Sequence, residues 1–297
     1  MYSGPALMAL TELFAEILKA QEPLAPYTAL QVGGRAQFFA EPRSEEELGQ
    51  LIACCYEEKM PLRVLAAGTN VLIRDEGVGG VVCRLSAPAF QFVTIDGHRV
   101  RAGAAVSLTQ LIAEVCRHCL AGLESLIGTP GTVGGALFCS LGSPGSTFMN
   151  GVDRIEFYDH QGQRCSVSRD DWDALLAEHL PPVVLAVEFM LEADDAESIL
   201  RRLRRAWISR HGRQPFFFQR TARMFQEPRG LSLEQLFEQA GIRHYRAGNV
   251  AVSERDPNFV VVQPGATARE VLLFIEQLRH RVYEHTGHTL RLEPSVW

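Results

Sequence analysis

A run of nine residues, 128 to 136, constrains this chain more than any other part of its sequence. Five of the nine are glycine or proline, and two are threonine. An ordinary turn needs one or two such residues, whereas a run of this length suggests backbone laid against a flat ligand or a pyrophosphate, with threonine hydroxyls as donors. We therefore expect a ligand-binding loop here. The run consists of Gly128, Thr129, Pro130, Gly131, Thr132, Val133, Gly134, Gly135 and Ala136.

A second segment of small residues follows an expected strand at 62–65. Successive N–H groups in such a turn can form a concavity that binds a phosphate, and Thr69 and Asn70 add side-chain donors. No Gly-Lys-Ser/Thr follows, so the segment is not a Walker loop, and it does not match the GxGxxG dinucleotide turn. By itself it fits either a ligand loop or a structural turn. Its members are Ala66, Ala67, Gly68, Thr69, Asn70, Val71 and Leu72.

The elements expected around these loops alternate between helix and strand. Ser44 and Thr267 are the expected N-caps of two helices, and Asp96-Gly97 is a hairpin signal. An amphipathic helix is expected at Ala6–Ala20; because its polar face carries glutamates and no row of lysines, packing on the protein is favoured over membrane adsorption. The expected helices are 44–57, 108–120, 196–209, 232–240 and 268–285, and the expected strands are 37–40, 62–65, 80–85, 90–95, 98–102, 154–158, 183–191 and 259–262.

Composition narrows the class of protein. With 297 residues and 46% hydrophobic content, the chain can form two or three compact units. A net charge of −6 gives no general basic field, so we expect no nucleic-acid partner. Without an apolar run of about 20 residues or a secretory signal, we expect no membrane association and a cytoplasmic protein.

Seven cysteines, an odd number, predict reduced thiols. Cys116-Arg117-His118-Cys119 fits ordinary helix packing or, less favoured, a metal or redox role.

The order of motifs along the chain resembles the UDP-N-acetylenolpyruvoylglucosamine reductases of peptidoglycan synthesis. Both small-residue loops contribute to the resemblance, which covers nearly the whole chain. The remaining motifs are Val32–Ala36, Glu41-Pro42, Ile73–Gly77, Leu236–Gly241, Val252-Ser253, Asn258-Phe259 and Leu292–Pro294.

The resemblance implies an α+β fold in which two subdomains of the vanillyl-alcohol-oxidase (PCMH) type hold FAD and a C-terminal α+β domain closes over a sugar nucleotide. The implied domains are 1–87, 88–210 and 211–297. In the family the first loop meets the FAD pyrophosphate and the second runs beside the flavin, so residues 66–72, 128–132 and 134–136 are the expected cofactor site. The family's reaction would pass hydride from NADPH to FAD and then to a UDP-sugar enolpyruvyl group.

Three positions depart from the family's catalytic pattern. Arg223 stands where the family has its proton-donating serine, and Ser295 stands where it has a glutamate. Ala177 falls where a helper arginine belongs. Gln226 and Glu227 replace the family's neighbouring lysine and asparagine, and Ser140 and Pro144 replace its asparagine and tyrosine on the ligand side. Since each lost catalytic group typically contributes about 10²-fold or more, we expect the family's reaction to be lost.

Alternatives stay open at this point. Glu227, His179, Ser295 or Arg223 could serve a different reaction. Phe216-Phe217-Phe218 fits the packing of a connecting strand, or, with Arg220 and Arg223, a plug in the substrate pocket. Three functions follow: a flavin-binding paralogue without the family's activity, a working reductase with a drifted site, or a scaffold without flavin.

Overall fold

The computed structural model describes residues 10–139, 147–178, 182–213, 220–228 and 230–297. The chain forms two compact units, each assembled from three segments. Unit 1 comprises residues 1–21, 37–67 and 79–208, and unit 2 comprises residues 22–36, 68–78 and 209–297. The three-domain division expected from the sequence stays a prediction.

Unit 1 contains most of a four-stranded sheet and the helix that packs on it. The parallel pair of β3 (Leu62–Val64) and β5 (Val78–Cys83) brings Leu62 opposite Val81. Helix α2 (Glu45–Glu57) begins at the expected N-cap, Ser44, whose hydroxyl accepts from the Glu47 N–H. The strands lie in the order β1 (Leu18–Pro23), β2 (Arg35–Ala40), β5 (Val78–Cys83) and β3 (Leu62–Val64).

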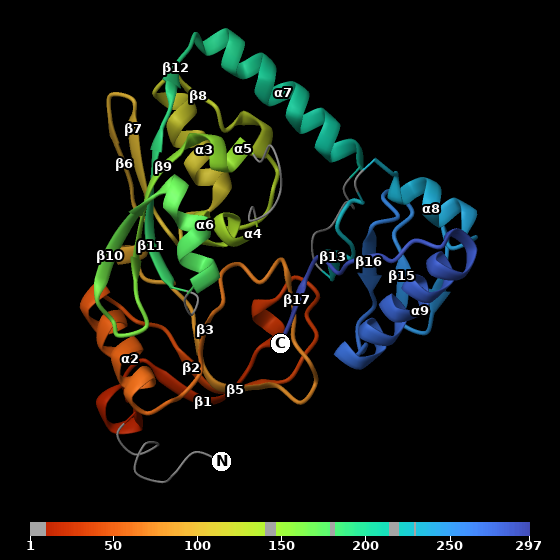
Figure 1. The fold of residues 1–297 in the computed structure, drawn as a ribbon, viewed down its shortest axis with the longest axis horizontal. Coiled ribbons are helices and arrows are strands. Elements are labelled where there is room, and N and C mark those ends of the chain that lie inside the picture. The colour runs from red at the N-terminus through yellow and green to blue at the C-terminus, as the bar shows by residue number, and fades with distance from the viewer. Residues whose placement is uncertain (1–9, 140–146, 179–181, 214–219, 229) are drawn as a thin grey trace. The chain divides into compact units, whose positions relative to one another are not determined.

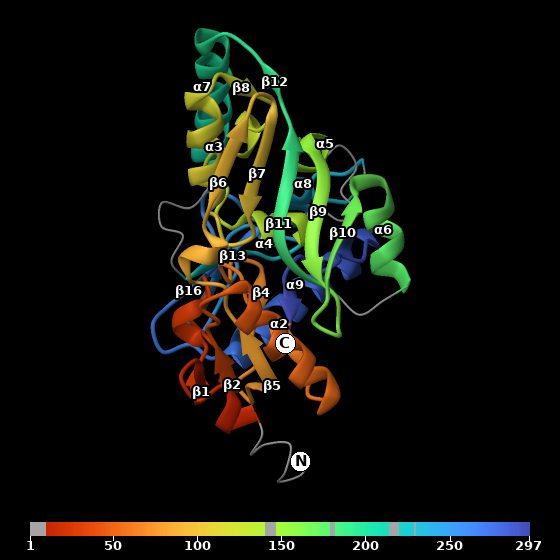
Figure 2. The ribbon, with the colours of Figure 1, turned by 90° about the vertical axis from the view of Figure 1, so that its left-hand side faces the viewer.

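A five-stranded antiparallel sheet forms the rest of unit 1 (Figures 1 and 2). Its apolar face is covered by helices α3 (Leu108–Arg117), α4 (Val133–Cys139) and α6 (Arg169–Glu178). Trp172 of α6 is fully buried there and meets Phe157 edge to face. The strand order is β10 (Arg164–Ser168), β9 (Val152–Tyr158), β11 (Val183–Met190), β7 (Arg99–Gly103) and β6 (Val93–Asp96).

Unit 2 is built on a smaller sheet with two helices, α8 (Leu233–Gln239) and α9 (Ala268–Thr286). Helix α9 begins at Thr267 with a complete capping box, as the sequence predicts. The sheet order is β13 (Thr221–Arg223), β16 (Phe259–Val262), β15 (Val250–Val252) and β14 (Arg246–Ala247), and a separate parallel pair joins β4 (Val71–Leu72) to β17 (Ser295–Val296).

One long helix and several short elements complete the described part of the chain. Within the described residues, no helix is long and apolar enough to cross a membrane. The division between the two units falls within the long helix α7 (Ala196–Arg213), between residues 208 and 209. The other short elements are η1 (Ala25–Tyr27), η2 (Pro88–Phe90), β8 (Leu120–Ala121), η3 (Glu124–Leu126), α5 (Thr147–Gly151) and β12 (Glu192–Ala193).

The N-terminal helix expected at Ala6–Ala20 is wrong beyond residue 13. Only residues 10–13 of its described part are helical, a turn follows, and β1 begins at Leu18. The periodicity was misleading because Phe14 and Ile17 reach the core from this turn, and the Ile17 carbonyl accepts from the Glu41 N–H. Leu13, expected on the same apolar face, is 71% exposed.

Candidate functional site

The beginning of the first loop lies directly against the second loop within unit 1. A side chain added at Gly135 would place its Cβ 3.2 Å from the Ala66 Cβ and 3.3 Å from the Thr132 hydroxyl. Glycine at this position therefore permits the close approach of the two loops. The Thr132 hydroxyl accepts from the Gly135 N–H at 3.2 Å, which fixes the start of α4. Ala67, which follows Ala66, is exposed.

Backbone bonds tie the second loop to the segment before α3. The Leu108 N–H donates to the Gly131 carbonyl at 3.1 Å, and the Val133 N–H donates to the Val106 carbonyl at 2.9 Å. Gly134 is buried, whereas Pro130 is exposed. Gly128, Gly131 and Ala136 are half-buried. The loop is thus supported from one side, while part of its surface stays accessible.

Thr129 provides the test of whether these residues suit a cofactor. Its backbone N–H donates to the Leu126 carbonyl at 2.9 Å, so the residue is held in place. Its hydroxyl is buried and has no hydrogen-bond partner in the part of the chain that the structure describes. A buried polar atom without a partner is costly unless a ligand or water satisfies it. The run therefore fits a ligand that offers a polar atom at Thr129.

The remainder of the first loop, Gly68 to Leu72, belongs to unit 2. Gly68 has φ +64°, and a Cβ there would lie 2.1 Å from the Tyr27 carbonyl oxygen, so another residue would clash. The Asn70 carbonyl accepts from the Ser295 N–H at 3.0 Å, and Val71 and Leu72 form β4 beside β17. Thr69 and Asn70 are half-buried. The loop is therefore fastened to the C-terminal strand that contains Ser295.

The segment containing Arg223 is paired with the segment before Ser295. The Glu293 N–H donates to the Met224 carbonyl at 2.9 Å, and the Gln226 N–H donates to the Arg291 carbonyl at 3.0 Å. Between these two bonds, the side chain of buried Asn258 bonds both the N–H and the carbonyl of Phe225.

These hydrogen bonds connect the segments of two of the three expected catalytic positions, Arg223 and Ser295, within unit 2. The third, Ala177, is exposed on α6 of unit 1. Arg220 lies just before β13, and its N–H donates to the Ala29 carbonyl at 2.7 Å. The side chain of Glu178 and residues Ser140, Pro144, His179 and Phe216–Phe218 lie outside what the structure describes.

Charge is distributed unevenly around Arg223. Its guanidinium lies 3.3 Å from the Glu227 carboxylate, and both side chains are largely exposed. Glu293 is half-buried, and burial raises the pKa of its carboxyl, with Arg223 opposing the shift and Glu227 adding to it. The Leu292–Pro294 motif contributes to the family resemblance, but the sequence predicts no role for the Glu293 carboxyl. Its environment depends on a segment about 70 residues earlier, which periodicity does not reveal.

Cys116 lies in the last turn of α3, and Cys119 follows the end of the helix. Cys116 packs against the core of unit 1, and burial raises the pKa of its thiol to about 11. His118 directs its Nδ1 to the Glu114 carbonyl, 2.9 Å away. Across the described ranges, no group of three or more histidine, cysteine, aspartate or glutamate residues could hold a metal ion.

Two family models match the chain. Residues 36–168 match a model described as an FAD binding domain, and residues 214–297 match the UDP-N-acetylenolpyruvoylglucosamine reductase C-terminal domain. A solved structure of UDP-N-acetylenolpyruvylglucosamine reductase (MurB) from Thermus caldophilus is similar, with a TM-score of 0.77 and 32% identity, and 93% of this chain and 97% of that one are covered. The expected combination of a PCMH-type FAD-binding fold with a C-terminal substrate-type domain is confirmed.

Whole-length relatives agree with these matches. The UDP-N-acetylenolpyruvoylglucosamine reductase of Rhodopirellula baltica is 32% identical, and the alignment covers 97% of each chain. The reductase of the same name from Geobacter metallireducens is 34% identical, with 96% of this chain and 95% of that one covered. The expected resemblance is confirmed, and this chain belongs to the UDP-N-acetylenolpyruvoylglucosamine reductase family.

Proposed function

We propose that this protein binds FAD through residues 66–72, 128–132 and 134–136 and no longer reduces UDP-N-acetylenolpyruvoylglucosamine at a useful rate. Flavin binding is supported by the family model over residues 36–168 and by the buried Thr129 hydroxyl that lacks a protein partner among the described residues. When bound, FAD would supply hydride transfer, taking hydride from NADPH and delivering it to an acceptor.

The proposed loss of the reduction is supported by the residues at the three positions that correspond to the family's catalytic pattern. Reduction of an enolpyruvyl double bond needs a proton donor and stabilisation of the resulting enolate. Arg223 keeps its charge at any working pH, so it is a poor acid, and its side chain already interacts with Glu227. Ser295 offers a hydroxyl in place of the carboxyl that the family has at this position, and Ala177 offers no polar group.

One observation carries this proposal. Two consecutive hydrogen-bonded connections join the substituted segments to the first loop: Glu293 to Met224, and Ser295 to Asn70. The positions of Arg223 and Ser295 therefore belong to one hydrogen-bonded part of unit 2, whereas Ala177 lies on α6 of unit 1. The side chains at these two positions, an arginine paired with Glu227 and an exposed serine, replace the serine and the glutamate that the family has there.

The structure also favours a second candidate, a working reductase with a relocated acid. Glu293 lies two residues before Ser295, is half-buried, and has a raised pKa. A carboxyl with a raised pKa keeps its proton to a higher pH than an ordinary glutamate, and it would be a candidate proton donor. In this case Glu293→Gln would abolish turnover, whereas the primary proposal predicts no turnover to lose.

The test starts with the purified protein. Visible flavin absorbance, with FAD identified after release, would support cofactor binding; a colourless protein that takes up no added FAD would indicate a flavin-free scaffold. The protein would then be reduced with NADPH and mixed with UDP-N-acetylenolpyruvoylglucosamine in a stopped-flow instrument.

Restoring the family's groups sharpens the same test. The combined variant Arg223→Ser, Ser295→Glu, Ala177→Arg should gain substrate-dependent reoxidation by roughly 10²-fold or more over the unmodified chain. A matched control, Arg291→Ser, changes an exposed arginine of the paired segment and should gain nothing. Fast, substrate-dependent reoxidation of the wild type would contradict the proposed loss.

A further inference from the structure

A buried carboxylate stands immediately before the glycine-rich loop. Glu124 is 6% exposed and lies at the start of η3, four residues before Gly128. One carboxylate oxygen accepts from the Gly122 N–H at 2.8 Å. The other accepts from Nε and Nη2 of Arg202, at 2.9 and 2.7 Å. The charge of Glu124 is therefore satisfied by a guanidinium 78 residues away in the sequence.

Arg202 is itself fixed on α7. Its Nη2 also lies 2.7 Å from the Asp194 carboxylate, just before the helix begins. Ile199, one turn earlier, is 2% exposed and anchors α7 to unit 1. The Asp194 N–H donates to the Cys119 carbonyl at 2.9 Å, which joins this region to the strand before Glu124. The Arg202–Glu124 ion pair thus connects α7 to the chain after β8, and the Asp194–Cys119 hydrogen bond connects the segment before α7 to the chain before β8.

The connection continues directly into the glycine-rich loop. The Ile127 N–H donates to the Glu124 carbonyl at 3.2 Å, and the Thr129 N–H donates to the Leu126 carbonyl at 2.9 Å. The turn that Glu124 holds therefore presents Thr129, whose hydroxyl is the buried group lacking a partner among the described residues. Residues 122–128 lie in no strand and contain the short η3, so the hydrogen bonds of the Glu124 side chain add to the backbone bonds that hold this turn.

We propose that Glu124 and Arg202 are positioning residues for the flavin loop, which set Thr129 and Gly128 in the conformation that binds the cofactor. The inference rests on the proposed binding of FAD and adds a role for two residues outside the loop. A site placed on a loop keeps its geometry only if supporting side chains hold it. Replacing a residue that orients a ligand contact typically weakens ligand binding by about 10- to 100-fold, by analogy with metal sites.

The experiment uses the full chain, stripped of flavin and titrated with FAD. Glu124→Gln keeps the size of the side chain and an acceptor for Gly122, but removes the charge that binds Arg202. Arg202→Gln removes the guanidinium. Arg201→Gln is the matched control, because Arg201 is the next residue on α7 and bonds only to Glu197 and Ser198 of the same helix among the described residues.

We expect Glu124→Gln and Arg202→Gln to raise the dissociation constant of FAD by about tenfold or more. The visible circular dichroism of the bound flavin should change as well, whereas a role only in folding would leave it unaltered at saturating FAD. Arg201→Gln should match the wild type in both measurements. Wild-type affinity and wild-type flavin dichroism in both Gln variants would overturn the inference.

Two further results separate the possible failures. A wild-type protein that binds no FAD defeats the proposed function, whereas a wild type that binds FAD as tightly as Glu124→Gln defeats only the positioning role. If the Gln variants do not fold, Arg202→Lys decides: it keeps the charge but loses the two-pronged contact. It should fold and bind FAD several-fold more weakly, and unchanged binding would count against the inference.

Discussion

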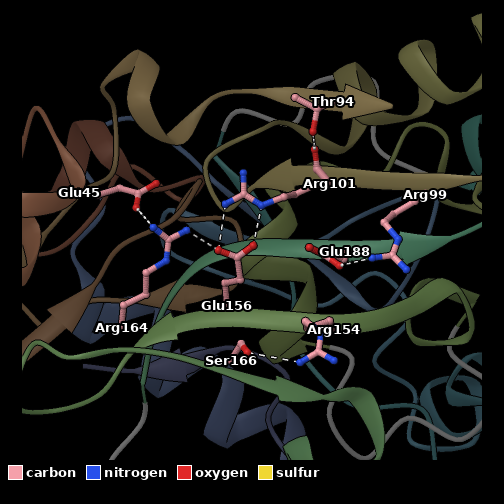
Figure 3. A network of polar contacts seen from close by, with 9 residues as sticks. All are labelled: Glu45, Thr94, Arg99, Arg101, Arg154, Glu156, Arg164, Ser166 and Glu188. Carbon is pink, nitrogen blue, oxygen red and sulfur yellow. Dashed lines mark hydrogen bonds and ion pairs between the residues drawn. The ribbon is translucent and has the colours of Figure 1, made fainter. Parts of the chain in front are cut away.

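The two units each contain a cluster of arginines and glutamates, and the clusters differ in how completely the charges are satisfied. On the polar face of the five-stranded sheet in unit 1, Arg101 makes a two-pronged contact with Glu156 at 2.6 and 2.9 Å (Figure 3). Arg164 bridges Glu156 and Glu45 at 2.6 and 2.9 Å. In unit 2, Arg223 contacts Glu227 at 3.3 Å, and Glu293 makes no ion pair within the described residues.

The difference appears in the pKa values of two glutamates, Glu156 in unit 1 and Glu293 in unit 2. Hydrogen bonds from Arg101, and then from Arg164, lower the pKa of Glu156 to about 2 against burial. For Glu293, burial outweighs the attraction of Arg223, so its pKa is raised. A carboxylate with good partners stabilises a sheet, whereas a half-buried carboxyl without them lowers stability at neutral pH. Such groups occur more often at functional sites, which fits the resemblance of this segment to the family's catalytic region.

The largest effect is expected for Glu156→Gln. Because the pKa of Glu156 is lowered, its ionised carboxylate stabilises the fold at pH values above 4.5, the ordinary pKa of the group. This stability is lost as the pH falls through about 2. Because Arg164 is half exposed and solvent screens the contact, we expect a loss of about 1–2 kcal/mol near neutral pH. Urea unfolding at several pH values measures it. A variant as stable as the wild type at pH 7 would remove the distinction between the clusters.

A smaller effect of opposite sign is expected for Glu293→Gln. Since burial raises the pKa of Glu293, its ionised form is penalised at neutral pH, and the penalty disappears below the ordinary value of 4.5. The variant should therefore be more stable than the wild type at pH 7, by less than about 1 kcal/mol, and equally stable in acid. Thermal unfolding across this pH range tests the sign. Destabilisation at pH 7 would show that Glu293 has a partner that compensates its burial.

The smallest effect is expected for Glu227→Gln. Its contact with Arg223 joins two largely exposed side chains four residues apart, and such pairs contribute less than about 0.5 kcal/mol. The free energy of unfolding should stay within that range of the wild type. A loss similar to that of Glu156→Gln would mean that the site cluster is a structural ion pair as well.

Local signals account for the parts of the fold that the sequence predicts. The capping box at Thr267 and the turn at Asp96-Gly97 each depend on residues a few positions apart, and both α9 and the β6–β7 hairpin are confirmed. The N-terminal helix failed because burial of Phe14 and Ile17 depends on tertiary contacts that periodicity does not encode. The strand β10 was not expected, since its pairing with β9 depends on the hairpin between them.

The candidate site divides in the same way. Glycine content and motif order predict a cofactor site at residues 66–72, 128–132 and 134–136, because a close approach needs small residues in a continuous stretch. Glu124 and Glu293 could not be found by such reasoning. Their partners, Arg202 and the segment around Met224, are remote in the sequence and meet them only in the folded units.

The rate at which NADPH-reduced protein is reoxidised by UDP-N-acetylenolpyruvoylglucosamine tests the central claim most directly. The measurement requires only wild-type protein loaded with FAD and a matched sample without substrate. Retained flavin binding with a lost proton donor predicts that both samples reoxidise at the same slow rate. Rapid reoxidation that depends on the concentration of the substrate would contradict this account.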